Sequence, residues 1–321
     1  MDDVILLADS KSNSWQFAKE VEDYIQQERK TKIHLEEVSV RQFNNGEIDM
    51  HVPKNMRRKD IYFIHDATKN PQGWWVELLM LKDLLLSASA ESVTLVLPNM
   101  LYSRKDRKEK PHVPISARAL ANTISPGSKR IITMDLHSDQ IQGFYPPTCP
   151  FDNLHSYPEA TRYLTTHNLP NLENLTIVSP DGGGVNRARA FAKKMKVKNP
   201  IAFIYKRRDK PGSIEEMLLV GDVKNSDILI VDDIIDSGGT LIKAAELLRE
   251  HGAKELYCYG THGFFTKGTK ELCKTFNRVM TSNTHYKEGA LNGVEIVDVA
   301  PVFAEAIYRA QKGISISELF E

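Results

Sequence analysis

The alternation of short apolar runs with longer amphipathic stretches is the feature of this sequence that most constrains the fold. The stretches near 14–29 and 75–88 have the length and polarity pattern of helices, and similar stretches separate other apolar runs. Continuous apolar strands separated by helices are typical of parallel sheets with both faces covered, because crossover helices lie on the faces. We therefore predict an α/β fold. The runs with strand character are VILLAD, IYFIHD, VTLVLP, IITMDL, LTIVSP, AFIY, ILIVDD and LYCYGTHG.

An internal similarity bears on the number of domains. Residues 60–102 have the order strand, loop, helix, strand, and residues 227–265 repeat that order. A duplicated fold would explain the repeat, and so would the general likeness of all βαβ units. A Pro-rich stretch at 145–154 is the best candidate for a boundary. We predict two domains, 1–150 and 151–321, and expect the last helix to pack on the first domain.

The composition excludes several classes of protein. Lys and Arg together number 42, as do Asp and Glu, so no net charge attracts nucleic acid or an anionic membrane. No apolar stretch approaches the roughly 18 residues of a membrane span, and the N-terminus resembles a first strand and not a signal peptide. The three cysteines are too scattered for a disulfide framework. We expect a cytoplasmic protein that binds neither nucleic acid nor membrane.

One strand ends in a motif that indicates a ligand. In ILIVDDIIDSGGTL, at 228–241, an apolar run leads into Asp232 and Asp233, and a Ser-Gly-Gly-Thr loop precedes an amphipathic helix. Such a loop lies where backbone N–H groups and the helix dipole favour a phosphate. Adjacent carboxylates would repel that phosphate unless they hold sugar hydroxyls or a metal-bound substrate. A sugar phosphate meets both requirements, and we expect Asp236 or Ser237 to cap the helix.

Two other interpretations fit this motif less well. An ordinary βα turn needs glycine at a tight corner, but three Asp residues within five positions are costly in a turn. A hydrophobic run that ends in Asp is also typical of a Walker B strand, which requires a GxxxxGK[ST] loop elsewhere in the chain. The nearest candidate, GFFTKGTK at 263–270, has Lys and Gly in the wrong order. We reject the NTPase interpretation.

A second candidate site is a basic loop at 102–110, directly after another predicted strand. In a chain without net charge this loop suits a polyphosphate, which Arg can grip bidentately, although a solvated charged loop is an alternative. Asp135 and His137 follow at the end of the next strand. A His beside acids at a strand end is a candidate for binding a metal or a phosphate. The basic residues of the loop are Arg104, Lys105, Arg107, Lys108 and Lys110.

Taken together, these segments resemble the class I ribose-phosphate diphosphokinases, the phosphoribosyl diphosphate (PRPP) synthetases of the type I phosphoribosyltransferase fold. The resemblance implies two tandem phosphoribosyltransferase-like domains, of which the first has a degenerate PRPP loop. It also implies transfer of the β,γ-diphosphoryl group of Mg-ATP to the 1-hydroxyl of ribose 5-phosphate, giving PRPP and AMP. The segments that carry it are FNNGEI (43–48), YSRKDRK, PISAR, TMDLHSDQIQGF, FDNL, SPDGGG (179–184), YKRRDK (205–210), VGDV, VDDIIDSGGT, THGFF, SNT and GISISELF.

The resemblance further implies which residues hold the two substrates. The residues expected to bind ribose 5-phosphate form the acid-glycine loop: Asp232, Asp233, Asp236, Ser237, Gly238, Gly239 and Thr240. The residues expected to bind ATP come from three segments of the first domain: Phe43, Asn45, Glu47, Arg104, Lys105, Asp106 and His137. Phe43 would stack on adenine from a neighbouring subunit, and the resemblance implies a hexamer built from dimers.

For the transfer step the resemblance implies Lys206, Arg208 and His137 as catalytic residues. Lys206 and Arg208 would close over the transferred group on a mobile loop, while His137 and Asp181 would help to coordinate Mg²⁺ and its waters. Phosphoryl transfer leaves a protein little to do beyond alignment and charge neutralisation, so cations and metal dominate over a strong base. Mg²⁺ prefers oxygen ligands and keeps several waters, so few protein ligands are expected.

Two alternatives remain from the same fold. One is a catalytically silent regulatory subunit, which the presence of Lys206, His137 and the full VDDIIDSGGT motif disfavours. The other is a phosphoribosyltransferase, which would not need the ATP-like segments FNNGEI and YSRKDRK. Lys105 and His112 depart from the Gln and Arg that many synthetases carry at these positions. Control by phosphate and ADP therefore does not follow from the resemblance.

Overall fold

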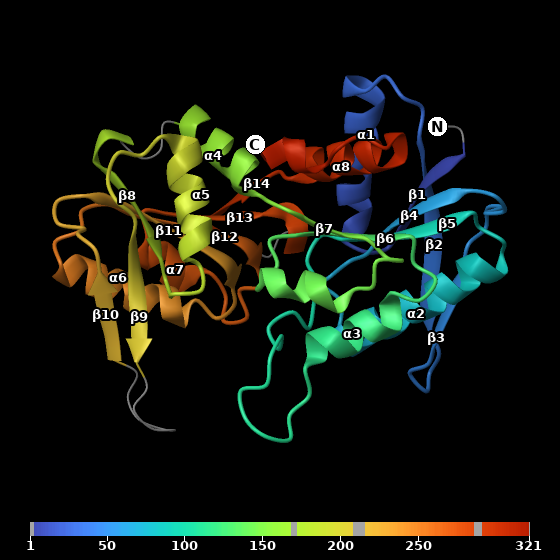
Figure 1. Cartoon of the computed structure of the whole chain (residues 1–321), viewed down its shortest axis with the longest axis horizontal. Helices are drawn as coiled ribbons and strands as arrows, with labels where there is room; N and C mark the ends of the chain where they lie inside the picture. The colour runs from blue at the N-terminus through green and yellow to red at the C-terminus, as the bar shows by residue number, and fades with distance from the viewer. Residues whose placement is uncertain (1–2, 168–171, 208–215, 286–290, 321) are drawn as a thin grey trace. The chain divides into compact units, whose positions relative to one another are not determined.

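The computed structural model of the chain describes residues 3–167, 172–207, 216–285 and 291–320. The chain divides into two compact units. The first contains Met1–His155, Thr284–Tyr286 and Val299–Glu321, and the second contains Ser156–Asn283 and Lys287–Asp298. Each unit has a seven-stranded sheet with helices on both faces (Figure 1). The predicted domain bounds stay a prediction, because compact units need not be the units that fold alone.

The sheet of the first unit is parallel except at one edge. Its order is β3-β2-β1-β4-β5-β6-β7, and only β2 and β3 pair antiparallel. Its strands are β1 Val4–Asp9, β2 His34–Gln42, β3 Ile48–His51, β4 Asp60–Ile64, β5 Ser92–Leu97, β6 Arg130–Met134 and β7 Phe151–Leu154. Its helices are α1 Ser14–Glu28, α2 Pro71–Ser87, α3 Ser116–Ile124, η1 Asp139–Phe144, α8 Ala300–Lys312 and η4 Ser317–Phe320.

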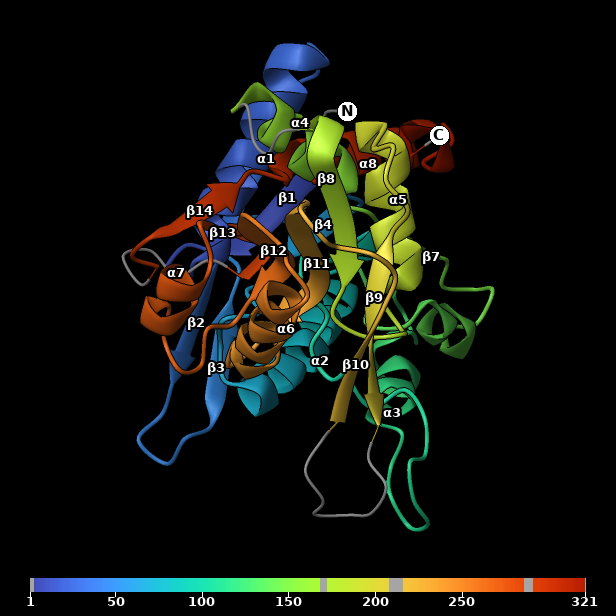
Figure 2. The ribbon, with the colours of Figure 1, turned by 90° about the vertical axis from the view of Figure 1, so that its left-hand side faces the viewer.

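The second unit repeats this arrangement. Its order is β10-β9-β8-β11-β12-β13-β14, again with one antiparallel pair, β9 and β10. Figure 2 shows these strands with α6 in front of them. The strands are β8 Leu175–Ser179, β9 Ala202–Arg207, β10 Glu216–Val220, β11 Asp227–Ile235, β12 Leu256–Gly263, β13 Arg278–Ser282 and β14 Val294–Val297. The helices are α4 Tyr157–Thr166, η2 Leu172–Asn174, α5 Val185–Met195, α6 Gly239–Glu250 and α7 Lys270–Thr275, and η3 Asn283–His285 follows β13.

The two sheets therefore have the same strand order when β1 is matched to β8. The segment β4, α2, β5 takes the same place in the first unit as β11, α6, β12 takes in the second. These are the two segments whose likeness the sequence reveals, and the shared order favours a duplicated fold over a chance likeness. The α/β fold predicted from the apolar runs is confirmed, with two mixed, mostly parallel sheets.

Apolar packing fixes α6 on one face of the second sheet. Its stripe of Leu241, Ala244, Ala245 and Leu248 is buried, as its helical spacing predicts. The stripe packs in one cluster with apolar side chains of β8, β9, β11, β12 and β13. Burial of one Leu side chain contributes about 1.5–3 kcal/mol, so this face stabilises the corner at which α6 begins.

The N-terminal ends of α2 and α6 are formed in different ways. α2 starts at Pro71, before the Trp75 expected from the pattern, because Asn70 Oδ1 accepts hydrogen bonds from the backbone N–H groups of the first turn. The N-cap position of α6 is neither Asp236 nor Ser237, although Ser237 Oγ accepts a hydrogen bond from the N–H of Gly239 in the first turn at 3.4 Å. The N-cap is Gly238, with φ 78° and no side-chain cap, because the chain turns through a left-handed residue there.

The last helix packs inside the first unit, against α1. The rings of Phe17 and Phe303 meet edge to face at 5.3 Å, and Arg29 Nη2 lies 2.5 Å from Glu305 Oε2. Tyr62 Oη donates to Gln311 Oε1 at 3.0 Å, which ties α8 to β4 as well. In the described parts of the chain no helix is both long and apolar enough to span a bilayer.

Candidate functional site

The acid-glycine loop forms the corner between β11 and α6. A Cβ built on Gly238 would lie 2.7 Å from Leu272 Cδ1, and the residue has a positive φ of 78°. Only glycine combines that φ with so close an approach of a neighbouring side chain. The corner is therefore sharp, and the first turn of α6 follows the end of β11 directly, as phosphate binding at a helix N-terminus requires.

Three connections of the second unit reach the same edge of its sheet. β8 pairs in parallel with both β9 and β11, so the carboxyl ends of these strands meet there. The acid-glycine loop follows β11, the SPDGGG segment follows β8, and Lys206 lies near the end of β9. Lys206 is half-buried. Arg208, predicted as its catalytic companion, lies outside the described residues.

The SPDGGG segment is a turn held by its own aspartate. Asp181 Oδ1 accepts hydrogen bonds from the backbone N–H of Gly183 at 2.9 Å and of Gly184 at 3.0 Å. Ser179 Oγ donates to the carbonyl oxygen of Asp181 at 2.7 Å. Asp181 thus shapes the turn that leads into α5, whatever ligand it also holds.

The paired carboxylates of the motif share one arginine. Arg187 Nη1 of α5 lies 3.5 Å from Asp233 Oδ1 and 4.0 Å from Asp232 Oδ1. Burial raises the pKa of Asp232 well above its ordinary value and the charge of Asp233 raises it further, while Arg187 lowers it. A pair of adjacent carboxylates, one buried and one half-buried, is stabilised by a cation or by hydroxyl donors. This environment fits the sugar hydroxyls that the sequence assigns to it.

The remaining residues of the predicted ribose 5-phosphate loop close the corner. Asp236 Oδ1 accepts a hydrogen bond from Thr266 Oγ1 at 2.8 Å, which ties the loop to the segment after β12. Gly239 N–H donates to Ser237 Oγ at 3.4 Å. Gly239 and Thr240 are exposed. The structure thus brings all seven predicted loop residues into one corner, and their roles in binding stay predictions.

In the first unit, the predicted adenine-binding residues lie together on the turn between β2 and β3. Asn45 Nδ2 donates to Glu47 Oε2 at 2.7 Å, and Phe43 N–H donates to the carbonyl oxygen of Glu47 at 2.8 Å. The Phe43 side chain is 49% exposed, with the guanidinium of Arg41 over its ring at 5.3 Å. An exposed ring beside a cation is available for stacking on a base. The placement leaves the predicted adenine role open to test.

The basic loop follows β5, and His137 follows β6, its parallel neighbour. Arg104 and Lys105 are exposed, Asp106 is half-buried, and Lys105 pairs with Glu109. His137 is exposed as well. Both segments leave the same edge of the first sheet, whereas β1 and β4 separate β5 from β2, the strand that precedes Phe43. The predicted ATP residues therefore form two groups along this edge.

The corner between β4 and α2 takes the same place in the first unit, and the chain itself fills it. Lys69 Nζ lies 2.7 Å from Asp9 Oδ2 and 2.7 Å from Glu77 Oε2. Asn70 occupies backbone N–H groups at the start of α2. The N–H groups that could bind a phosphate at the start of α2 therefore bond to Asn70, and the nearby cation of Lys69 is already paired with Asp9 and Glu77. This agrees with the degenerate PRPP loop that the resemblance implies.

Two of these residues escaped prediction. Arg187 lies in VNRARAF, a pattern that any solvated helix could have, and only the packing of α5 on β8 and β11 brings it to the carboxylates. Lys69 sits in a polar loop and meets Asp9 only because β1 and β4 are neighbours. A basic residue three positions after a Gly-rich turn is the one signal that could have indicated Arg187.

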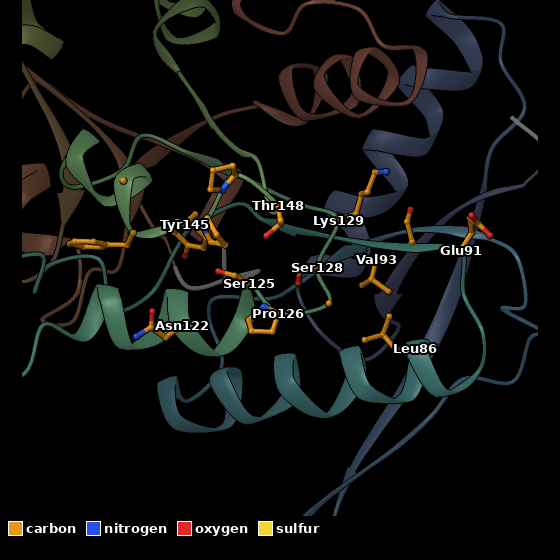
Figure 3. Close-up of a pocket in the computed structure, with 16 residues that line it drawn as sticks. Leu86, Glu91, Val93, Asn122, Ser125, Pro126, Ser128, Lys129, Tyr145 and Thr148 are labelled. Carbon is orange, nitrogen blue, oxygen red and sulfur yellow. The ribbon is translucent and has the colours of Figure 1, made fainter.

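A pocket of about 900 Å³ lies elsewhere in the first unit (Figure 3). Its walls include Val93 and Lys129 at the amino ends of β5 and β6, together with Ser125, Tyr145 and Thr148. It contains none of the predicted site residues. Ligands of open α/β sheets bind at the carboxyl ends of the strands, so this pocket is a poor candidate for the substrates.

Among the described residues, no three His, Cys, Asp or Glu side chains lie together as a ready metal site. Asp181, one of the two residues predicted to help coordinate Mg²⁺, offers a carboxylate, a hard oxygen donor that suits Mg²⁺ better than the softer metals. A cation that is held largely by substrate phosphates and water needs few such donors. The donor set therefore fits Mg²⁺.

Two family models match the sequence. The N-terminal domain of ribose phosphate pyrophosphokinase matches residues 6–126, and the phosphoribosyl transferase domain matches residues 151–294. A ribose-phosphate pyrophosphokinase of Cereibacter sphaeroides is 40% identical over 313 residues, which cover 95% of this chain and 91% of that protein. Ribose-phosphate pyrophosphokinase 4 of Saccharomyces cerevisiae is 38% identical over 297 residues, which cover 91% of this chain and 89% of that protein.

A solved structure gives the same result. The crystal structure of phosphoribosylpyrophosphate synthetase from Mycobacterium smegmatis matches 97% of this chain and 99% of its own, with a TM-score of 0.83 and 30% identity. These likenesses confirm the predicted fold and the predicted enzyme class, ribose-phosphate diphosphokinase. The chain belongs to the ribose-phosphate pyrophosphokinase family.

Proposed function

We propose that the corner between β11 and α6 holds ribose 5-phosphate, and that the chain transfers the β,γ-diphosphoryl group of ATP to its 1-hydroxyl. The observation that carries this proposal is the pair of half-buried Asp232 and buried Asp233 beside a glycine corner at which a helix begins. The carboxylates accept hydrogen bonds from the ribose hydroxyls, and the backbone of 237–240 holds the 5-phosphate.

In the reaction, the 1-oxygen of the sugar forms a bond to the β-phosphorus of ATP. The bond from that phosphorus to the oxygen bridging the α- and β-phosphates breaks, AMP leaves, and the hydroxyl proton passes to solvent. Lys206 and Arg208 neutralise the charge that spreads over the transferred oxygens. Arg104, Lys105 and His137 hold the ATP phosphates, with Asp106 beside them.

Magnesium is the cofactor we infer, and His137 and Asp181 are the residues that would help to coordinate it and its waters. Asp181 uses Oδ1 for the turn, and Oδ2 makes no hydrogen bond within the described residues. When bound, Mg²⁺ neutralises phosphate charge and orients the diphosphoryl group. Asp181 would hold a water of the ion from the SPDGGG turn.

Self-association completes the proposed enzyme. Exposed Phe43 supports a stacking role across a subunit boundary, and further apolar side chains are exposed on α2 and on the β9–β10 edge. We propose a hexamer built from dimers. All three cysteines are unpaired, which supports a cytoplasmic location. The exposed apolar residues on these elements are Val76, Met80, Leu86, Tyr205, Leu218 and Val220.

The deciding experiment measures AMP release by the purified chain with ATP, Mg²⁺ and ribose 5-phosphate. We expect AMP and PRPP in equal amounts, and a rate that depends on the sugar phosphate. AMP release without added ribose 5-phosphate would contradict the proposed acceptor. No AMP at all would favour a silent regulatory subunit, while PRPP consumption with a nitrogenous base would indicate a phosphoribosyltransferase.

A matched pair of variants tests the corner itself. Asp233→Ala should chiefly weaken ribose 5-phosphate binding, because it removes one acceptor for the sugar hydroxyls. Asp222→Ala, in an exposed loop of the same unit, is the control and should leave binding unchanged. Unchanged affinity in Asp233→Ala would count against the assigned role.

A further inference from the structure

We propose that Trp75 is a positioning residue for ATP binding: through Tyr102 and Thr123 it holds the basic loop in the conformation that presents Arg104. This inference rests on the proposed role of Arg104 at the ATP phosphates. It assigns a function to the second member of the Trp74–Trp75 pair, whose two side chains have different surroundings. Trp74 is fully buried, whereas Trp75 is half-buried beside the basic loop.

The first step is the link between α2 and α3. Trp75 Nε1 donates a hydrogen bond to Thr123 Oγ1 at 2.8 Å, and Thr123 Oγ1 donates to the carbonyl oxygen of Leu120 at 2.8 Å. The hydroxyl is therefore acceptor and donor at once, so its hydrogen points away from the indole. The indole N–H of Trp75 thus has the hydroxyl oxygen of Thr123 as its acceptor, and this hydrogen bond orients the ring.

The second step is the contact of that ring with the loop. The rings of Trp75 and Tyr102 meet at 4.8 Å between centroids, with an interplanar angle of 63°. Tyr102 has φ 63°, a left-handed conformation that is rare for a bulky residue and persists only where the surroundings hold it. The aromatic contact is such a restraint, and it acts two residues before Arg104.

The third step is the other end of the loop segment. Ala117 N–H, in the first turn of α3, donates to the carbonyl oxygen of Lys105 at 3.2 Å. The segment 102–105 is thus anchored on both sides of Arg104, by Tyr102 on Trp75 and by Lys105 on α3, and Thr123 joins Trp75 to that same helix. Figure 1 shows the long connection from β5 that leads into α3. We call Trp75, Tyr102 and Thr123 the frame; together with the Lys105–Ala117 hydrogen bond they restrain the backbone on both sides of the exposed Arg104.

An exposed arginine on an otherwise free loop loses rotational and backbone entropy when it grips a polyphosphate. A frame that restricts residues 102–105 before binding reduces that loss. Trp75, Tyr102 and Thr123 themselves contact neither substrate in the proposed scheme. Removal of the frame should therefore raise KM for ATP and leave kcat and KM for ribose 5-phosphate nearly unchanged.

The test uses the full chain in the PRPP-forming assay. Trp75→Phe keeps an aromatic ring and removes the N–H, and Thr123→Val removes the acceptor with little change in shape. Each should raise KM for ATP about fivefold, the effect of one lost hydrogen bond. Kcat should stay within about twofold of the parent value, since the frame acts on binding alone.

The double variant should be no worse than either single one, because both break the same bond. Thr123→Ser, which restores the hydroxyl, should restore KM.

Three controls separate the possible failures. Trp15→Phe, on α1, should change neither KM. Arg104→Ala should raise KM for ATP more than any frame variant. An inactive parent enzyme would overturn the proposed function and this inference together. An active parent in which Arg104→Ala raises KM for ATP, while Trp75→Phe and Thr123→Val do not, would overturn the positioning role alone. Equal losses for both substrates with a lower melting temperature would show a general structural role and also overturn it.

Discussion

Arg187 Nη1 lies 3.5 Å from Oδ1 of Asp233 and thereby joins α5 to the end of β11. We expect Arg187→Met to raise KM for ribose 5-phosphate about tenfold, because the carboxylates lose the cation that orients them and keeps them ionised. Steady-state kinetics with ribose 5-phosphate as the varied substrate measures the effect. Arg189→Met, two residues along the same helix on its exposed side, is the matched control. Equal effects of the two substitutions would contradict the orienting role.

The filled corner of the first unit should be sensitive to its cation. Lys69→Met leaves the buried carboxylates of Asp9 and Glu77 without their shared cation, and we expect the free energy of unfolding to fall by about 3–5 kcal/mol. Urea denaturation at neutral pH measures it. Lys274→Met, which breaks the exposed pair with Glu271, should cost less than about 1 kcal/mol. A similar loss in both variants would show that burial of the Lys69 cluster contributes nothing.

The two glycines of the corner should respond differently to alanine. Gly238→Ala forces a side chain into a positive φ and against Leu272, and we expect a loss of about 1–3 kcal/mol in the free energy of unfolding. Gly239 has no positive φ, and its nearest contact would be Ser237 Oγ at 3.6 Å. Gly239→Ala should therefore keep its stability and chiefly weaken ribose 5-phosphate binding, because the phosphate must approach the backbone there. Thermal unfolding and substrate titration of both variants decide the matter.

A buried histidine should make the protein sensitive to acid. Burial lowers the pKa of His65 from 6.5 to about 3, and the charge of Lys69 lowers it further. Between these two values the unfolded chain binds a proton that the folded chain does not. Stability from this group should thus fall as pH falls from 6.5 towards 3, by at most about 1.4 kcal/mol per pH unit.

His65→Gln should remove this contribution while keeping a donor for the carbonyl oxygen of Trp74, which His65 Nε2 approaches at 3.0 Å. Urea unfolding at several pH values between 4 and 7 measures the slope. Glu77 and Lys69 face the same imidazole and remain in the variant, so the difference between the two slopes isolates the histidine. Identical slopes would show that His65 is not the responsible group.

Lys206 should act on the rate more than on binding. We expect Lys206→Ala to lower kcat about a hundredfold or more and to change KM for ribose 5-phosphate little, because the lysine neutralises charge that appears only in the transition state. Initial rates at saturating ATP measure both constants. Lys224→Ala, in an exposed turn of the same unit, should change neither. A loss confined to affinity would refute the transition-state role.

Most inner strands of both sheets were predictable from the sequence, whereas the edge strands and the inner strands β2 and β13 were not. β1, β4, β5, β8 and β11 are apolar runs because helices cover both their faces. β2 reads HLEEVSVRQ and has one buried residue, Val38, so its pattern resembles a polar loop. β3, β7, β10 and β14 have four or five residues each, too few for a period to show. β2 and the short edge strands form because their backbones pair with a neighbouring strand.

In the candidate site, too, some residues could be predicted from the sequence and others could not. The acid-glycine corner is contiguous in the chain, so its residues and their chemistry could be predicted together. Arg187 comes from another helix, and the frame of Trp75, Tyr102 and Thr123 comes from three elements. Such contacts depend on how helices pack on the sheet, which no local pattern encodes. The N-cap position of α6 falls on Gly238, and not on Asp236 or Ser237, for a similar reason, because Leu272 lies next to Gly238 only after α7 has packed.

The contact between Phe17 and Phe303 has a consequence for biosynthesis. α1, at Ser14–Glu28, is translated long before α8, at Ala300–Lys312, which packs against its apolar side. Until α8 has been translated, the apolar side of α1 is therefore exposed and accessible to chaperones and proteases. A frameshift or stop codon upstream of residue 300 would damage a part of the protein that had already been translated intact.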